Sequence, residues 1–290
     1  MIEELVKNHL KEHYGDFTLV RLTGGYTNET FLLKGTQPSL VVKVAKTNNK
    51  DFENEINSLN FLQETEVVPK IYNLVETNQF KLVVMEYRQG LHGQSIIENH
   101  DIETTKVLFK SLGETLANRI HIKKHPITSK GIRKCTINEM NLNLDFVPEI
   151  LISRSRDILQ HINESKKDWV LTHGDYGVHN VLFSAESGLT VLDWEWSEWA
   201  DPLTDIIWVC WFTKLHYPEQ ADLLNRLFLE EYKKYNQVKL SPEKVKAYSL
   251  YKVWKVLQKV EQAPQAVQEE WIRRLKWTID TELVSSSMYY

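Results

Sequence analysis

The apolar positions in the first 88 residues fall mostly into short runs that are typical of strands. Two of these runs are separated only by the turn-forming residues 77–79, which predicts a hairpin. Within residues 51–64, apolar side chains recur at spacings of three and four, which predicts a helix. The strands are expected at 17–22, 29–34, 40–45, 71–76 and 80–87, after a short helix at 2–13. The pattern therefore predicts a small sheet with one main helix.

The pattern changes after Met85. The polar segment EYRQGLHGQ, residues 86–94, contains two glycines and is expected to link two parts of the chain. The remainder of the chain has mostly helical periodicity, interrupted at 169–196 by apolar runs that predict strands around a loop. The helices are expected at 102–122, 147–164, 202–214, 217–235, 242–261 and 265–283. We therefore predict an α+β fold in two lobes: residues 1–88 with a small antiparallel sheet, and a larger, mostly helical lobe at 89–290.

Charge and composition limit the possible partners. The chain has 35 basic and 39 acidic residues, a formal net charge of −4, which gives no general reason to expect nucleic acid or an anionic membrane as a partner. The longest strongly apolar run, IIWVCWF at 206–212, is too short to cross a bilayer, and the N-terminus lacks the apolar core of a signal peptide. Two cysteines without a C-x-x-C motif argue against a disulfide scaffold. These features predict a cytoplasmic protein and leave its oligomeric state open.

The densest group of chemically active side chains is HGDYGVHN, residues 173–180. Its Asp175 and Asn180 are five positions apart, so one loop can present a carboxylate to a hydroxyl group and an amide to a metal ion. Asp193 lies at the end of the β-like run LTVLD. Carboxylate and amide oxygens are hard ligands of the kind that Mg²⁺ prefers. These donor types make Asn180 and Asp193 candidate ligands of a magnesium ion.

Lys43 lies inside LVVKVA, an apolar run where a buried ammonium group requires anionic partners. Glu55 on the following helix is one such partner, and phosphate groups are another. The Gly24-Gly25 turn between the first two strands could bring backbone N–H groups close to phosphate. The run KLVVMEYRQG, residues 81–90, is typical of a strand that ends in a hinge. Together these features predict that the N-terminal lobe binds a nucleotide.

These motifs together resemble the aminoglycoside phosphotransferase and choline kinase family, whose members are relatives of the protein kinases. The resemblance is carried in order by LTGGYTNET, VVKVAK, ENEINSLNFL, LVVMEYRQG, LTHGDYGVHNVLF and VLDWEWSEWADPLTDI, over about residues 17–208. The most specific part is H-G-D-x-x-x-x-N followed by D-W-E. The resemblance implies a protein-kinase-like two-lobe fold and transfer of the γ-phosphate of ATP or GTP to a hydroxyl group of a small molecule, with Mg²⁺.

The resemblance also implies a role for each matching residue. Asp175 is the catalytic aspartate that orients the acceptor hydroxyl, and Lys43 contacts the α- and β-phosphates. Asn180 and Asp193 bind Mg²⁺, and Asp205 steadies the catalytic loop. The residues assigned to nucleotide binding are Gly25, Thr27, Lys43, Glu55, Glu86 and Arg88.

The acceptor is less well defined. Acids and aromatic faces in WEWSEWADP suit a cationic acceptor, which makes Glu195, Trp196, Glu198 and Trp199 possible substrate residues. The alternative is that these tryptophans pack the lobe and the acids face water. An aminoglycoside is the leading acceptor hypothesis. Choline or ethanolamine, homoserine, thiamine and sugars are the alternatives within the same family.

Other classes of site remain open on the sequence alone. His173, Asp175 and His179 have the ligand types of a zinc site, although zinc would leave Lys43 and Asp193 unexplained. Otherwise His173 is expected to brace the loop and His179 to be an exposed neighbour. A nucleotide-binding module without catalysis would keep the fold but is disfavoured by the complete residue set. The sequence has no DFG or APE motif, which argues against a protein kinase.

Overall fold

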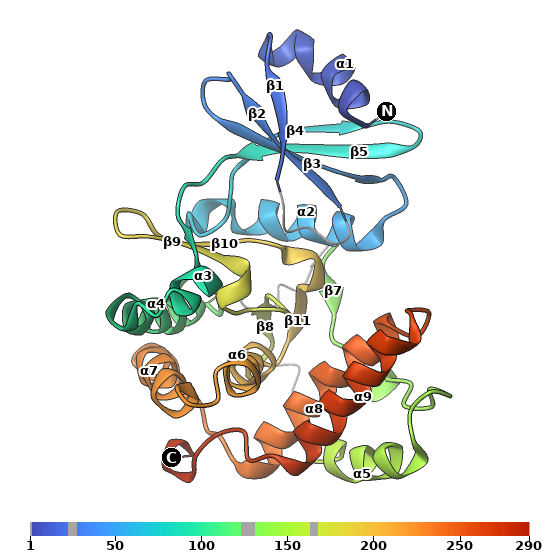
Figure 1. The fold of residues 1–290 in the computed structure, drawn as a ribbon, viewed down its shortest axis with the longest axis vertical. Coiled ribbons are helices and arrows are strands. Elements are labelled where there is room, and N and C mark those ends of the chain that lie inside the picture. The colour runs from blue at the N-terminus through green and yellow to red at the C-terminus, as the bar shows by residue number, and fades with distance from the viewer. Residues whose placement is uncertain (1, 23–27, 123–130, 163–167, 290) are drawn as a thin grey trace. The chain divides into compact units, whose positions relative to one another are not determined.

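The computed structural model describes residues 2–22, 28–122, 131–162 and 168–289. Their contacts define two compact units, and Figure 1 shows the elements of each. The first unit comprises the described parts of Met1–Gly93 and Lys130–Ile132 together with Asn180–Ser197. The second comprises the described parts of Gln94–Ser129, Arg133–His179 and Glu198–Tyr290. The segment that begins at Asn180 thus groups with the N-terminal strands.

The first unit is built on an antiparallel sheet with the strand order β1-β2-β3-β5-β4. Its strands are β1 (Thr18–Arg21), β2 (Glu29–Lys34), β3 (Leu40–Lys46), β4 (Ile71–Glu76) and β5 (Phe80–Glu86). Its helices are α1 (Ile2–Tyr14), α2 (Lys50–Leu62) and the short η1 (Gln63–Thr65). A second small sheet pairs β6 (Leu91–His92), β9 (Val181–Ser184) and β10 (Gly188–Val191), and a turn of helix, η6 (Trp194–Trp196), comes after it. The predicted order of strands and main helix is confirmed.

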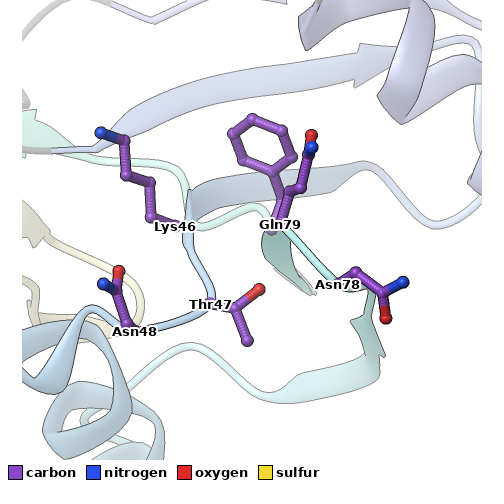
Figure 2. Close-up of a pocket in the computed structure, with 6 residues that line it drawn as sticks. Lys46, Thr47, Asn48, Asn78 and Gln79 are labelled. Carbon is purple, nitrogen blue, oxygen red and sulfur yellow. The ribbon is translucent and has the colours of Figure 1, made fainter.

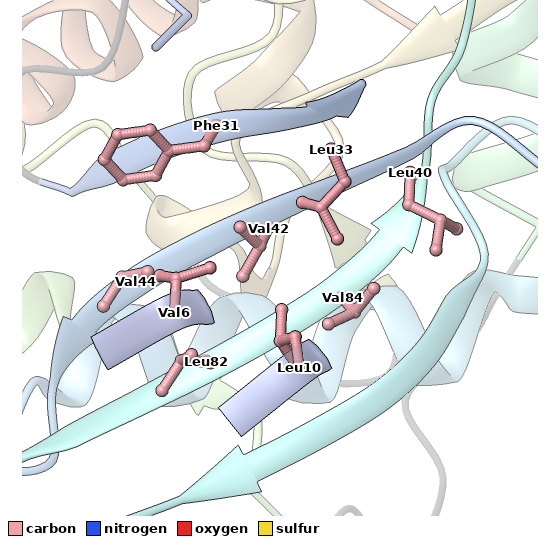
Figure 3. Close-up of a cluster of buried hydrophobic side chains, with 9 residues drawn as sticks. All are labelled: Val6, Leu10, Phe31, Leu33, Leu40, Val42, Val44, Leu82 and Val84. Carbon is pink, nitrogen blue, oxygen red and sulfur yellow. The ribbon is translucent and has the colours of Figure 1, made fainter. Parts of the chain in front are cut away.

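Alternation along β3 decides what each face of the large sheet contacts. On one face, Val42 and Val44 pack with α1 in a buried apolar cluster (Figure 3), which is completed by Val6, Leu10, Phe31, Leu33, Leu40, Leu82 and Val84. On the other face, Val41 and Ala45 pack against Phe52 and Ile56 of α2. Because side chains in a strand alternate between faces, Lys43 lies on the face that α2 covers. The strand pattern therefore directs this lysine toward the helix.

The second unit is mostly helical. It holds α4 (Ile102–Thr115), the π-turn η2 (Leu116–Ile120), η3 (Ile137–Glu139), α5 (Glu149–Leu159), α6 (Leu203–His216), α7 (Ala221–Lys233), α8 (Pro242–Lys259), α9 (Gln265–Asp280) and η7 (Ser286–Met288). A three-stranded sheet joins β7 (Arg133–Lys134), β11 (Glu198–Ala200) and β8 (Val170–Thr172), in that order. The helix α3 (Gly93–Glu98) and the turn η5 (Val178–Asn180) lie where the chain passes from one unit to the other.

The predicted helices are present, with shifted ends. The helix expected at 102–122 ends as an α-helix at Thr115 and continues as the π-turn η2. The helix expected at 217–235 begins only at Ala221, after Pro218. The expected start of α8 is confirmed, because the Ser241 side chain accepts a hydrogen bond from the N–H of Lys244. In the part of the chain that the structure describes, no helix combines the length and apolarity that a membrane crossing requires.

The first unit also has an open hollow at one end of its large sheet (Figure 2). Its volume is about 650 Å³, and it is lined by Lys46, Thr47, Asn48, Asn78, Gln79 and Phe80. None of these is a predicted site residue, and Lys46 supplies the single formal charge. The hollow therefore gives no chemical reason to place the reaction there.

Candidate active site

Lys43 is the charged centre of the first unit. Its Nζ lies 2.9 Å and 2.7 Å from the two carboxylate oxygens of Glu55, and 3.1 Å from Oδ1 of Asp193. Lys43 is 9% exposed and Glu55 is 3% exposed, whereas the Asp193 carboxylate is more open to solvent. Burial by itself lowers the pKa of Lys43, but the two carboxylates outweigh it and hold the pKa above its usual value. The ammonium group therefore stays charged, and of its two carboxylate partners Asp193 is the one more open to solvent.

The segment after Asp193 is fixed to α2 by polar contacts that the sequence did not reveal. The Asn54 amide donates to the carbonyl and the hydroxyl of Ser197, both at 2.9 Å, and the Ser58 and Ser197 hydroxyls are 2.6 Å apart. Asp193 itself has a φ of 62°, in the left-handed region that aspartate adopts more readily than most residues other than glycine. The signal in the sequence was the spacing of Asn54 and Ser58, two polar residues four positions apart on α2. The structure shows that both are buried. They hold the backbone that carries the Asp193 carboxylate.

A hairpin brings the two predicted metal ligands to neighbouring positions. Strands β9 and β10 pair Val181 with Val191, and the N–H of Leu192 donates to the carbonyl of Asn180 at 2.8 Å. Asn180 thus precedes the first strand of the hairpin, and Asp193 comes after the second. Their amide and carboxylate oxygens are the donor types that suit Mg²⁺. The ladder therefore places the backbones of these two residues, thirteen apart in sequence, near each other.

In the predicted nucleotide hinge, the backbone N–H groups of Glu86 and Tyr87 already donate hydrogen bonds within the protein. The N–H of Glu86 donates to the Lys70 carbonyl at 2.8 Å, and the N–H of Tyr87 donates to the Ser39 carbonyl at 3.1 Å. The Glu86 carboxylate lies 2.9 Å from Nε of Arg88. A base at this edge would therefore have to use other groups, such as the Glu86 carbonyl and the Arg88 N–H. Gly24, Gly25 and Thr27, which the sequence predicts to approach phosphate, lie outside the described residues.

In the second unit, Asp175 is held by two donors at a single oxygen. Trp208 Nε1 donates to Asp175 Oδ1 at 2.7 Å, and His179 Nε2 lies 3.2 Å from the same atom. Burial by itself raises the pKa of Asp175, but His179, Lys252 and the Trp208 hydrogen bond outweigh burial and lower the pKa to about 2. The carboxylate is therefore ionised at neutral pH. It is a weak base and a good acceptor of hydrogen bonds.

The two histidines of the loop have different surroundings from each other. His173 is fully buried, and its Nδ1 accepts from the N–H of Asp175 at 3.1 Å, which matches the bracing role expected for it. His179 differs from the expectation of an exposed neighbour. Its ring stacks on Phe212 at a centroid distance of 4.3 Å, because the 3₁₀ turn η5 directs it toward α6. Among the described residues, no three His, Cys, Asp or Glu side chains are grouped to hold a metal, so the zinc hypothesis gains no support.

Asp205 binds the backbone at the start of the HGDYGVHN loop. Its carboxylate accepts from the N–H groups of His173 at 2.7 Å and Gly174 at 2.8 Å, and lies 3.3 Å from Nε2 of His121. Burial alone raises the pKa of Asp205, but these contacts lower it overall, so the buried group remains an anion. Asp205 therefore fixes the backbone that leads into Asp175.

Replacing Asp205 by asparagine tests this bracing. An amide nitrogen cannot accept a hydrogen bond, so one loop N–H loses its partner. We expect kcat to fall about tenfold and stability to fall by about 1–3 kcal/mol, measured by initial rates and by denaturant unfolding. Asp201→Asn is the matched control, because Asp201 caps the N–H of Leu203 at 2.8 Å without touching the loop. An equal loss of kcat in both variants would refute the bracing role.

The four residues predicted to contact the acceptor differ in their exposure to solvent. Trp199 is fully buried on β11, and Glu198 is buried with its carboxylate 2.7 Å from Lys255 and 3.1 Å from the Tyr251 hydroxyl. Trp199 follows the packing alternative that the sequence left open, whereas Glu198 faces neither water nor an open site, because it is paired in the interior. Glu195 is also buried, whereas Trp196 is partly exposed. Cys210 of α6 is also buried, and burial raises the pKa of its thiol to about 12.

Comparisons with known proteins identify the family and the fold of the chain. Residues 18–240 match the model of the phosphotransferase enzyme family. An amicoumacin kinase in complex with AMP-PNP and Ca²⁺ has the same fold, with a TM-score of 0.73 and 14% identity over 98% of this chain and 95% of that one. For a thermostable mutant of aminoglycoside phosphotransferase APH(4)-Ia the TM-score is 0.69, with 17% identity over 94% and 98%. For a microcompartment-associated aminopropanol kinase it is 0.69, with 13% identity over 95% and 95%. A comparison with curated protein sequences found no match.

The fold is that of the protein-kinase-like small-molecule kinases, and the predicted fold class is confirmed. The family match covers well over half of the chain, so the chain belongs to the phosphotransferase enzyme family. It is a kinase whose acceptor group is a hydroxyl.

Proposed function

We propose that this kinase is Mg²⁺-dependent and transfers the γ-phosphate of ATP or GTP to a hydroxyl group of a small molecule. The observation that carries the proposal is the contact of Lys43 with both Glu55 and Asp193. Glu55 orients the ammonium group, and the exposed side of Asp193 leaves it room to meet phosphate oxygens. In phosphoryl transfer the protein mainly positions the reactants and neutralises charge, which is what this cluster supplies.

Asn180 and Asp193 are the residues that would hold the metal ion. Their oxygens suit Mg²⁺, which would neutralise charge on the phosphate oxygens when bound. The Glu86 carbonyl and the Arg88 N–H are proposed to recognise the base, and Gly25 and Thr27 the phosphates. Residues 1–88 would thus form the nucleotide-binding lobe, and residues 89–290 the catalytic and acceptor-binding lobe.

Asp175 is proposed to orient the acceptor hydroxyl and to take its proton late in the reaction. With a pKa of about 2 it is too weak a base to remove that proton early. The same low pKa keeps it ionised throughout the neutral and mildly acidic range. Protonation of Asp175 should therefore not limit kcat until the pH approaches about 2.

The acceptor is proposed to be an aminoglycoside. Structural neighbours include an aminoglycoside phosphotransferase with hygromycin B, a spectinomycin phosphotransferase and an aminopropanol kinase, so compounds that carry both amines and hydroxyls recur among them. Trp196 remains the proposed acceptor contact because it is partly exposed, whereas Glu195, Glu198 and Trp199 are buried. We further propose a cytoplasmic enzyme whose partners are its nucleotide and its small-molecule acceptor.

A coupled assay of ADP or GDP release tests the proposed function. ATP and GTP would each be combined with Mg²⁺ and a panel of aminoglycosides, choline, ethanolamine, homoserine, thiamine, methylthioribose and simple sugars. We expect turnover on one acceptor class, loss of turnover with EDTA and recovery with Mg²⁺. Nucleotide binding without transfer to any acceptor would instead favour the non-catalytic module.

A further inference from the structure

The indole N–H of Trp208 has a contact that its sequence context does not suggest. IIWVCWF reads as a core segment, and Trp208 is indeed 4% exposed. Yet its Nε1 donates to the Asp175 carboxylate at 2.7 Å, the short distance typical of a bond to a charged acceptor. A core tryptophan of α6 thus reaches the predicted catalytic group directly.

The Trp208 ring is itself held by neighbours within the second unit. It stacks on Trp211 with a centroid distance of 4.4 Å and an interplanar angle of 6°. The ammonium group of Lys252, a buried residue of α8, lies 5.3 Å from the ring centre and also donates to the carbonyl of Gly174. Aromatic stacking and a cation over an indole face both favour one ring orientation. The donor that meets Asp175 is therefore presented from a rigid support.

An aspartate needs such a support if it is to orient a substrate. The last torsion of its side chain joins a tetrahedral to a planar carbon, so its energy wells are broad and the carboxylate turns easily. Asp205 fixes the backbone before Asp175 but does not fix this torsion. A donor on Oδ1 does, because rotation of the carboxylate would break a charge-assisted bond.

We propose that Trp208 is a positioning residue of the reaction, which fixes the carboxylate of Asp175 in the orientation that receives the acceptor hydroxyl. This inference rests on the proposed role of Asp175. Trp208 acts on the transfer step through Asp175, and nucleotide binding is assigned to residues of the first unit. Loss of its N–H should therefore lower kcat and leave the nucleotide KM unchanged.

Two substitutions on the same helix separate positioning from packing. Trp208→Phe removes the N–H and keeps an aromatic ring. Trp211→Phe is the matched control, because it keeps an aromatic ring to stack on Trp208 and removes only an N–H that donates to the Thr278 hydroxyl at 2.8 Å. We expect kcat to fall roughly 10- to 100-fold in Trp208→Phe and less than about threefold in Trp211→Phe. Turnover is measured on the acceptor that the panel identifies, or as slow nucleotide hydrolysis with water as acceptor.

A spectroscopic readout tests the contact without requiring turnover. The indole N–H resonance of Trp208 is assigned in a nitrogen–proton correlation spectrum as the one that Trp208→Phe removes. Asp175→Asn should shift this resonance and leave the Trp211 resonance in place. An unmoved Trp208 signal, or equal losses of kcat in the two tryptophan variants, would overturn the inference. Full activity of Asp175→Ala would instead overturn the proposed function, so the two failures are distinguishable.

Discussion

Replacing Asp175 by alanine is expected to lower kcat by about 10²- to 10⁴-fold, the range that a positioned proton acceptor contributes. The low pKa of Asp175 keeps its carboxylate ionised at neutral pH. HGDYGVHN contains no second carboxylate that could take its place. Nucleotide affinity should change little, because the predicted phosphate and metal contacts lie in the first unit. Steady-state rates and a direct nucleotide-binding titration measure the two effects separately.

The control for this experiment is Asp157→Ala, which removes an exposed carboxylate from α5 in the same unit. It should retain normal turnover and normal nucleotide affinity. Near-normal turnover of Asp175→Ala would rule out the assigned role. A large loss of nucleotide affinity together with kcat would indicate that Asp175 supports binding, and the proposed division of tasks between the two units would then be wrong.

Replacing Lys43 by methionine is expected to abolish measurable turnover and to destabilise the protein. The substitution leaves Glu55, 3% exposed, without its cation. Removing one partner of a buried ion pair costs about 3–5 kcal/mol, because an uncompensated charge stays behind. Phosphate loses its ammonium contact at the same time. Chemical unfolding reports the change in stability, and the coupled assay reports turnover.

A second substitution separates the two consequences. In the double variant Lys43→Met, Glu55→Gln the buried charge is gone, so most of the lost stability should return. Turnover should stay absent, since the phosphate contact is still missing. If the double variant recovered activity along with stability, Lys43 would have only a structural role. The single variant Glu55→Gln completes a double-mutant cycle, which gives the interaction energy between Lys43 and Glu55.

The sequence predicted those parts of the site that depend on local pattern. Lys43 in an apolar strand required a carboxylate, and Glu55 on the next helix was the nearest candidate. The apolar runs at 169–196 also predicted strands around a loop, and the two strands that follow Asn180 form the hairpin that carries Asp193. In each case strand or helix periodicity decides which face a side chain occupies, and periodicity is visible in the sequence.

The parts that escaped prediction depend on contacts between distant segments. Trp208 lies in an apolar run that is typical of a core helix, and it is buried as that pattern indicates. Its indole N–H nevertheless donates to Asp175, 33 positions earlier in the chain. Glu198 was predicted as a possible substrate contact, whereas the structure pairs it with Lys255 and Tyr251 of α8 in the interior. Nothing local marks such pairs, because each residue alone fits an ordinary helix or strand. Spatial neighbours, and with them the acceptor residues, require the tertiary structure.

The path of the chain restricts how the protein could be divided into fragments. Asn180–Ser197 belongs to the first unit, while the residues directly before and after it belong to the second. A fragment that ends at Gly93 would contain Lys43 and Glu55 but lack both proposed metal ligands. No single cut in the gene yields a complete first unit. Recombination that exchanges the helical part between relatives would have to retain this eighteen-residue insert as well.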